Sequence, residues 1–335
     1  MVSDRNGLNA ASRIRRGWRL TLIFLLLFVA LLGTIMFVGS DFSVQQLVEM
    51  FSHLEVRLLV VLLLLSCVNF ISRACRWHWY SKQQGLNVSV KDSFSYYVAG
   101  FAMGVTPGRM GELIRMWLMR QGHRISYHRT LPLLIADRVN DLLIIIVLTL
   151  AAGLIAGSDS LRYVFLALFV MVMAYVLLRH PDVLISLIDS VYAKVRRGKK
   201  LFAAARRSLR TGREMFSASS AVFASIFSLV AWLAECIAFY LLLSALDTGI
   251  SIDLAIFIYS FATLVGALSF LPGGLGGFEV VAVILLGAQG ADLGEAVFAT
   301  TVIRLTTLWF SVVLGSFLLS HLLINLNMRV TRVKT

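Results

Sequence analysis

Charged residues are scarce in this chain of 335 residues. Asp, Glu, Lys and Arg together make up 15% of it, whereas water-soluble domains usually carry about 25%. Hydrophobic residues make up 59%, and the mean hydropathy is +0.83. Because so much apolar surface has to face lipid, the composition excludes a soluble globular protein and predicts an integral membrane protein.

The chain also lacks the short motifs of several enzyme and cofactor classes. Its three cysteines, Cys67, Cys75 and Cys236, show no Cys-x-x-Cys or Cys/His ligand spacing, and we interpret them as small hydrophobic residues of apolar blocks. We find no nucleophile beside a base, no metal-ligand set and no nucleotide-binding or cofactor loop. The sequence therefore predicts a protein that is not an enzyme, with no catalytic residue, no cofactor and no metal site.

Apolar residues gather in separate blocks, several of which are long enough to cross a hydrocarbon core of about 30 Å as helices. The first block has no small-residue cleavage site, so we expect it to be a retained span and not a signal peptide. We predict six full crossings, at residues 20–38, 58–71, 131–155, 161–178, 221–246 and 298–324.

Two further apolar stretches, residues 94–118 and 254–289, are interrupted by Pro-Gly sequences at Pro107 and Pro272. Proline inside a helix removes a hydrogen bond and clashes with the preceding turn. Since broken backbone at membrane depth is tolerated where protein or water surrounds it, we expect two re-entrant hairpins of short half-helices. The predicted fold class is all-α: a polytopic integral membrane protein with about six crossings plus two hairpins, or about eight membrane segments.

Positive charge is distributed unevenly along this topology. With a cytoplasmic N-terminus, 27 of the 31 Lys and Arg fall in cytoplasmic segments, and the outer segment, residues 247–296, holds none. The sequence thus predicts a multi-pass protein of a cell membrane with cytoplasmic N- and C-termini. The formal charge of +13 sets this orientation and gives no reason to expect a nucleic acid partner.

The cytoplasmic side is rich in basic and aromatic residues. Ten Lys and Arg lie within residues 179–213, a segment that can bind anionic lipid head groups at the inner leaflet. Orientation and solvation explain such a run without a specific ligand, and we favour that interpretation. Trp77, Trp79 and Tyr80, next to Arg73 and Arg76, are expected to form an interfacial aromatic belt.

The two interrupted stretches resemble each other. Each contains Pro-Gly-x-x-Gly with a glutamate close behind, Glu112 in the first and Glu279 in the second. Arg138 follows the first proline by 31 residues and Arg304 follows the second by 32, each within the next long apolar block. Matched arginines inside predicted spans indicate an internal repeat.

Three predicted crossings separate the two interrupted stretches. Because this number is odd, the second half has to be inverted relative to the first, which is the usual construction of alternating-access carriers. We therefore expect one membrane domain over residues 1–335 with inverted repeat halves at about 20–156 and 161–324, the second of which includes the basic segment 179–213.

Each Pro-Gly interruption leaves a helix N-terminus whose free N–H groups and positive dipole end attract anions such as phosphate. Ionisable side chains within spans cost roughly 2.5–3.5 kcal/mol each on insertion scales, and by default they mark a functional site or a buried pair. The candidate residues for head-group binding and transport are Pro107, Gly108, Arg109, Gly111, Glu112, Arg115, Asp137, Arg138, Asp141, Glu235, Pro272, Gly273, Gly274, Gly276, Glu279 and Arg304.

Two interpretations of these charges stay open. In a structural one, Glu112 pairs with Arg138 and Glu279 pairs with Arg304, which holds the hairpins in place. In a functional one, the two arginines bind a lipid phosphate while a carboxylate such as Glu235 takes a cationic head group or a proton. Both can hold, since a carboxylate can release its arginine to the phosphate during transport.

Three segments carry a family resemblance: Pro-Gly-Arg-Met-Gly-Glu-Leu-Ile-Arg at 107–115, Asp-Arg-Val-Asn-Asp at 137–141, and Leu-Pro-Gly-Gly-Leu-Gly-Gly-Phe-Glu at 271–279. Together they resemble the lysylphosphatidylglycerol synthase transmembrane family, over about residues 20–324. The resemblance implies a flippase-like domain that moves a polar-headed lipid between leaflets, in a bacterial inner membrane or an archaeal one. Fused members carry a soluble aminoacyl-transfer domain, whereas this chain ends at Thr335, so we expect a stand-alone member.

The sequence and the resemblance predict translocation of a phosphate-containing lipid, or lipid-linked intermediate, by alternating access. One alternative is an intramembrane enzyme acting on lipid phosphate with Glu112, Asp137 and Asp141 as acid and base. Another is an accessory protein that regulates a lipid-modifying enzyme through residues 179–213, and an ion or proton antiporter is a third. The expected partners are membrane lipids, with a separate lipid-modifying or glycosyl-transferring enzyme, and no nucleic acid.

Overall fold

The protein is described by a computed structural model over residues 49–52, 54–106, 110–156, 161–195, 199–269 and 271–332. Every regular element in these ranges is helical, which confirms the predicted all-α class. The predicted crossing at 20–38 lies outside the described residues. So do three candidate site residues of the first interruption, Pro107, Gly108 and Arg109.

Four stretches of helix are long and apolar enough to cross a membrane. They are α3 (Val56–Gln83), α6 (Tyr127–Ala156), α10 (Ala218–Ala245) and a C-terminal stretch built from α13 (Leu293–Arg304), η5 (Leu305–Trp309) and α14 (Phe310–Arg332). Each of these covers one of the predicted crossings, and α3 continues well beyond the predicted end at residue 71. The chain is therefore a multi-pass membrane protein.

The bent pair of α7 (Leu161–Arg179) and α8 (Pro181–Val195) is a fifth candidate span. The chain turns by 84° between them, directly before Pro181, whose fixed φ suits the first position of a new helix. The basic segment 179–213, which we expected as a cytoplasmic connection, is helical over most of its described length. It forms α8, α9 (Lys199–Gly212) and the start of η3 (Arg213–Phe216).

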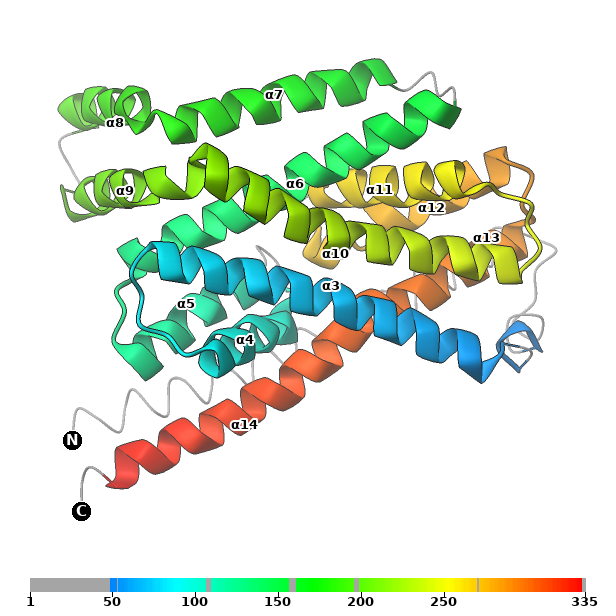
Figure 1. Ribbon diagram of the computed structural model, residues 1–335, viewed down its shortest axis with the longest axis horizontal. Helices are drawn as coiled ribbons and strands as arrows, with labels where there is room; N and C mark the ends of the chain where they lie inside the picture. Colours follow the sequence, from blue (N-terminus) through cyan, green and yellow to red (C-terminus); the bar gives the residue numbers. More distant parts are fainter. Residues whose placement is uncertain are drawn as a thin grey trace.

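Both interrupted stretches form pairs of short helices. The first consists of α4 (Val90–Ala99), η1 (Gly100–Met103) and α5 (Met110–His123); the second consists of α11 (Ile252–Leu268), η4 (Pro272–Gly274) and α12 (Gly277–Ala288). Figure 1 shows α4 and α5 toward one end of the molecule and α11 and α12 toward the other, with the long helices running between the ends.

The long helices pack against each other and against the hairpins. Along the contact between α3 and α10, the Asn69 side-chain amide donates to the carbonyl of Ala231 over 2.9 Å. Between α6 and α11, the Thr149 hydroxyl donates to Ser260 over 2.9 Å. The C-terminal helix α14 packs on α4 and η1 of the first hairpin. Large apolar side chains on the outside of α3, α10 and α14, such as Leu64, remain exposed and are suited to face lipid.

Candidate functional site

A buried network of charges joins α3 to α6. Asp137 and Asp141 are one turn apart on α6, where two carboxylates on the same helix face repel each other. The Arg76 guanidinium lies between them, 2.6 Å from Asp137 and 2.7 Å from Asp141. Arg73 adds a second contact to Asp141 at 2.6 Å. Because these side chains are almost wholly buried, removing one of them would leave its partners with less opposite charge in a place that water does not reach.

Arg115 connects the first hairpin to the same network. Its Nη1 atom lies 3.5 Å from Asp137, its Nε donates to the carbonyl of Tyr97 over 3.1 Å, and its guanidinium carbon lies 3.7 Å from the centre of the Tyr97 ring. Both α4 and α5 are thereby fixed to α6, which gives Arg115 a positioning role in this structure.

Arg138 is the most accessible arginine of this cluster. Its Nε atom lies 2.6 Å from Glu112 at the start of α5, and weaker contacts reach Asp137 at 3.9 Å and Asp141 at 3.7 Å. The Arg138 side chain is 24% exposed. We name Arg73, Arg76, Arg115, Arg138, Glu112, Asp137 and Asp141 the first cluster; its four arginines face three carboxylates, which leaves one net positive charge.

The second cluster is built around Arg304, the last residue of α13. Its Nε atom lies 2.6 Å from Glu279, and its Nη2 atom donates to the carbonyl of Gly273 over 2.8 Å. Glu279 also accepts the backbone N–H of Gly276 over 2.6 Å, capping the start of α12. One ion pair therefore ties the glycine turn to the next spanning helix, as Arg138 and Glu112 do in the first cluster.

The glycines of the second interruption have backbone conformations that other residues rarely adopt. Gly273, Gly274 and Gly276 have φ values of 63°, 69° and 86°, which cost glycine little because it has no Cβ atom. The chain that follows Arg304 is irregular too, because it forms a π-helical turn, η5. Single π turns inside α-helices occur frequently at functional sites.

The segment just before the first interruption contacts the second interruption. A Cβ atom on Gly273 would lie 3.0 Å from Val105, which shortly precedes the first Pro-Gly sequence. Val105 also packs in one small hydrophobic cluster with Leu275, Trp309 and Val312. Three segments thus meet inside the bundle: the residues just before the first Pro-Gly sequence, the glycine turn of the second hairpin and the π turn η5.

Gly111 allows a close backbone approach. A Cβ atom at Gly111 would lie 2.0 Å from the carbonyl oxygen of Gly100, so α5 rests directly on η1. In the second hairpin, a Cβ atom at Gly277 would lie 3.2 Å from the Cα atom of Gly266. Gly111 therefore allows the two helices of the first hairpin to pack closely, and its part in transport stays a prediction.

Glu235 stands apart from both clusters. It is buried on α10 and accepts a 2.7 Å hydrogen bond from the Tyr259 hydroxyl of α11. Within the described ranges, no Lys or Arg lies at ion-pair distance from it. Pro272, the remaining candidate, opens η4 beside Gly273.

Arg73 and Arg76 are the site residues that sequence reasoning missed. We placed them beside an interfacial belt of Trp77, Trp79 and Tyr80, and the structure shows this to be wrong, because Trp77 and Tyr80 are buried in the protein. The signal was present in the spacing. Two arginines three positions apart lie on one face of an apolar helix, and two carboxylates four positions apart lie on one face of another. Two such faces of opposite charge can pair with each other.

Comparison with known proteins identifies the family of this chain. Residues 18–315 match the family model described as the lysylphosphatidylglycerol synthase TM region. A UPF0104 membrane protein of Pyrococcus horikoshii is 23% identical over 305 residues, which cover 82% of this chain and 90% of that protein. A UPF0104 membrane protein of Methanothermobacter thermautotrophicus is 25% identical over 264 residues, 72% of this chain and 78% of that protein. The chain belongs to the family of the lysylphosphatidylglycerol synthase TM region.

Proposed function

We propose that this protein moves a phosphate-containing polar lipid, or a lipid-linked intermediate, between the leaflets of a cell membrane by alternating access. The observation that carries the proposal is the matched set of ion pairs Arg138–Glu112 and Arg304–Glu279, each with a 2.6 Å contact. Each pair lies next to a Pro-Gly interruption. Ionisable side chains within membrane spans are costly, and by default they mark a functional site.

The spacing of the packed residues supports an inverted repeat with halves near 20–156 and 161–324. The same sequence separation relates Gly100 to Gly266, Gly111 to Gly277 and Arg138 to Arg304. In both halves the two glycines form the close approach between the hairpin's helices, and the arginine pairs with the glutamate near the second helix's start. Shared packing at one sequence separation is the expected result of duplication.

The contacts between the halves support the same arrangement. From the first half, α6 packs on α11; from the second half, α14 packs on α4 and η1. Each hairpin is thus held by the last long helix of the other half. With α4 and α5 toward one end of the molecule and α11 and α12 toward the other (Figure 1), a rocking motion between the halves would expose the two clusters to opposite sides in turn.

The arginines supply the chemistry that a lipid phosphate needs. A guanidinium group binds phosphate with two parallel N–H donors, and the first cluster carries one excess positive charge. Arg138 is partly exposed, so an entering phosphate can displace Glu112 from it. The same exchange at Arg304 and Glu279 would pass the head group onward while the tails stay in the hydrocarbon region.

The orientation follows from charge. Arg120 lies in the last turn of α5 and Arg124 directly follows this helix, and Arg207 and Arg210 lie on α9. Helices α5 and α9 lie toward one end of the molecule (Figure 1). The second hairpin and its connections, residues 247–296, hold no Lys or Arg. We therefore place the α4, α5 and α9 end in the cytoplasm, as expected for a bacterial or archaeal plasma membrane protein with cytoplasmic termini.

Lipid flipping in proteoliposomes tests the proposal. Fluorescent phospholipids and a polyprenyl-phosphate analogue serve as substrates for the purified full chain. We expect flipping that depends on the head group, and a loss of at least tenfold in Arg138→Ala, Arg304→Ala and Glu112→Gln, because each change removes one side of a matched ion pair. Arg120→Ala is the matched control, since Arg120 is an exposed arginine on α5 that contacts Tyr127 and neither cluster.

The rival functions give different results in the same assay. Retained flipping in Arg138→Ala and Arg304→Ala would exclude the proposed path. An intramembrane enzyme would convert the labelled lipid into a new species without transferring it, and the wild-type protein would then show product on the accessible leaflet alone. A regulator would show neither activity, and deletion of residues 179–213 would abolish its effect on a lipid-modifying enzyme.

A further inference from the structure

Glu235 is a buried carboxylate within the spanning helix α10, where it is 6% exposed. Three other carboxylates are buried among the described residues, Asp137, Asp141 and Glu279, and each lies within ion-pair distance of an arginine. Glu235 has no such partner in the described ranges. The hydrogen bond that it accepts comes from the neutral hydroxyl of Tyr259, so no contacting cation neutralises its charge.

The surroundings of Glu235 are apolar. The Tyr259 ring lies against Phe239 and Phe278, with ring centres 5.6 Å and 5.5 Å away, and all three belong to a buried hydrophobic cluster that also contains Cys236. A charged carboxylate without a counter-ion is costly in such surroundings, and a bound proton removes the charge. In this arrangement a proton is the simplest neutralising ligand for Glu235.

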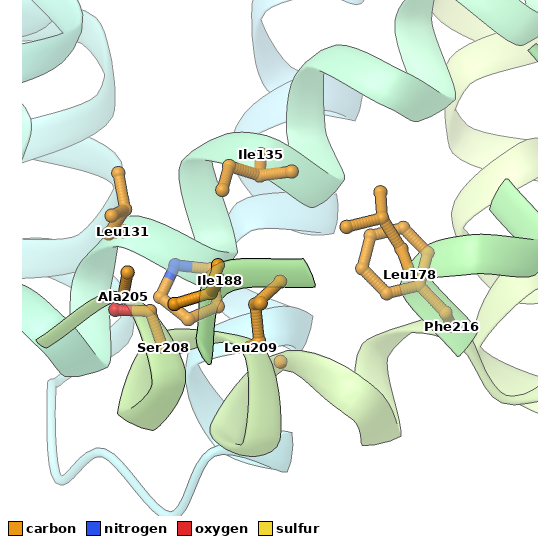
Figure 2. A pocket seen from close by; sticks show the side chains of 10 residues that line it. Leu131, Ile135, Leu178, Ile188, Ala205, Ser208, Leu209 and Phe216 are labelled. Carbon is orange, nitrogen blue, oxygen red and sulfur yellow. The ribbon is translucent and has the colours of Figure 1, made fainter. Parts of the chain in front are cut away.

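The cavity between α6 and α9 offers no comparable site. It measures about 210 Å³ and is lined by apolar side chains such as Ile135 and Leu209 (Figure 2). The one hydroxyl of its described lining, that of Ser208, already donates to the carbonyl of His128 over 3.2 Å. Because no ionisable side chain lines the cavity among the described residues, a proton carrier has to be sought in the bundle itself.

One face of α10 connects Glu235 to the first cluster. Ser228, Trp232 and Glu235 are spaced by four and three positions, so they lie on the same side of the helix. The Ser228 hydroxyl accepts a hydrogen bond from Arg76, and the Trp232 indole N–H donates to Asp141 over 3.3 Å. The face of α10 that carries Glu235 is therefore in contact with the charges of the first cluster.

Tyr259 connects Glu235 to the second cluster. Its ring lies edge-on to that of Phe278, and the guanidinium carbon of Arg304 lies 4.8 Å from the centre of the Phe278 ring. Phe278 directly precedes Glu279, the ion-pair partner of Arg304. The Glu235 carboxyl group thus lies between the two clusters, with contacts that lead to each of them.

Charges of both clusters act on Glu235. The ionisable groups that influence it or lie beside it come from α10 itself and from helices packed on α10: Cys236 of α10, Tyr259 of α11, Arg73 of α3, Asp141 of α6 and Arg304 of α13. The two arginines favour a charged carboxylate, while burial and Asp141 oppose it. A lipid phosphate bound to these arginines would offset their positive charge and so favour a proton on Glu235. By thermodynamic linkage, a proton on Glu235 would favour phosphate binding to the same degree.

We propose that Glu235 binds and releases a proton in each transport cycle, so that the protein carries a proton together with the anionic lipid. This inference rests on the proposed function and names its coupling ion. A proton and a singly charged phosphate together move no net charge across the membrane. A pH difference of about one unit would then support about a tenfold difference in lipid between the leaflets.

Proteoliposomes with an imposed pH difference test the coupling. Fluorescent phosphatidylglycerol and the polyprenyl-phosphate analogue serve as separate probes for the full chain, and a membrane-impermeant quencher measures the fraction in the accessible leaflet. We expect the wild-type protein to accumulate probe, above empty liposomes, in the leaflet that faces the more alkaline side. Glu235→Gln resembles the protonated carboxyl group, so this variant should exchange probe between leaflets without accumulating it.

Glu214→Gln is the matched control, because Glu214 is an exposed glutamate of η3 outside both clusters. This variant should accumulate probe as the wild-type protein does. Tyr259→Phe removes the hydrogen-bond donor of Glu235, and a donor of this kind favours the charged carboxylate. The pH profile of flipping should therefore shift to higher pH in Tyr259→Phe, whereas a purely structural contact would change stability and leave the profile in place.

Infrared difference spectroscopy tests the proton without any transport. When the full chain in liposomes is titrated, we expect the carbonyl band of a protonated carboxyl group that is present in Glu214→Gln and absent in Glu235→Gln. A wild-type protein without such a band, or accumulation by Glu235→Gln equal to wild type, would overturn the inference and leave the flipping proposal intact. A wild-type protein that flips neither probe above empty liposomes would refute both.

Discussion

At the scale of single residues, the arginines differ mainly in how far water can reach them. The side chain of Arg76 is fully buried and contacts both aspartates of α6, whereas that of Arg138 is 24% exposed and contacts Glu112 at close range. A buried ion pair is sensitive to the loss of one partner, because the remaining charge keeps its desolvation cost. Burial therefore assigns Arg76 to stability, whereas the partly exposed Arg138 is the arginine that exchanges partners in the proposed function.

This difference gives a prediction for two matched variants. Arg76→Leu removes the fully buried cation that lies between Asp137 and Asp141 and should lower the free energy of unfolding by about 3 kcal/mol or more. Arg138→Leu should cost much less stability and should act on lipid flipping. Thermal unfolding in detergent, followed by size-exclusion chromatography, measures the first effect. Equal destabilisation by both variants would show that burial does not separate their roles.

At the scale of elements, each hairpin depends on glycines at the contact between its helices. Gly111 of α5 rests on the carbonyl of Gly100, and Gly277 of α12 rests on Gly266. A methyl group cannot fit at 2.0 Å from an oxygen atom, so the backbone would have to move. The hairpins are thus fixed by small residues, as is common where helices pack closely in membranes.

Gly111→Ala tests this packing. The new methyl group should force α5 away from η1, shift Glu112 relative to Arg138, and lower the yield of folded protein. Gly287→Ala is the control, because Gly287 lies in helix α12 with no atom within 4 Å of an added Cβ. That change should leave the melting temperature unchanged or raise it, because it can add up to about 1 kcal/mol to the free energy of unfolding. A Gly111→Ala protein as stable as wild type would contradict the close packing.

The length of the apolar blocks and the Pro-Gly interruptions predicted most of these elements from the sequence. The apolar blocks predicted the described spans, and the second Pro-Gly sequence predicted the turn between α11 and α12, because both signals are local. The first Pro-Gly sequence lies outside the described residues. The pairing of Arg73 and Arg76 with α6 was not predicted, because charges at the end of an apolar block suggest the membrane–water interface unless their partner helix is known. Helices α8 and α9 were not predicted either, because the many basic residues of this segment suggested a solvated connection.

At the scale of the whole molecule, the two halves have to face opposite sides of the membrane if the carrier mechanism holds. Ser89 and Ser251 are suited to report this. Ser89 directly precedes α4 and Ser251 directly precedes α11 as their N-cap residues, and both are exposed. They occupy corresponding places at the start of the two hairpins, so an inverted repeat places them on opposite sides, whereas a parallel repeat places both on one side.

Cysteine labelling distinguishes these arrangements. In a background with Cys67, Cys75 and Cys236 replaced by alanine, Ser89→Cys and Ser251→Cys are exposed to a membrane-impermeant maleimide in intact cells and in inverted vesicles. We expect Ser251→Cys to react in intact cells and Ser89→Cys in inverted vesicles, because Lys and Arg are retained on the cytoplasmic side and residues 247–296 hold none. Reaction of both from one side would rule out inversion, and with it the opposed clusters on which alternating access depends.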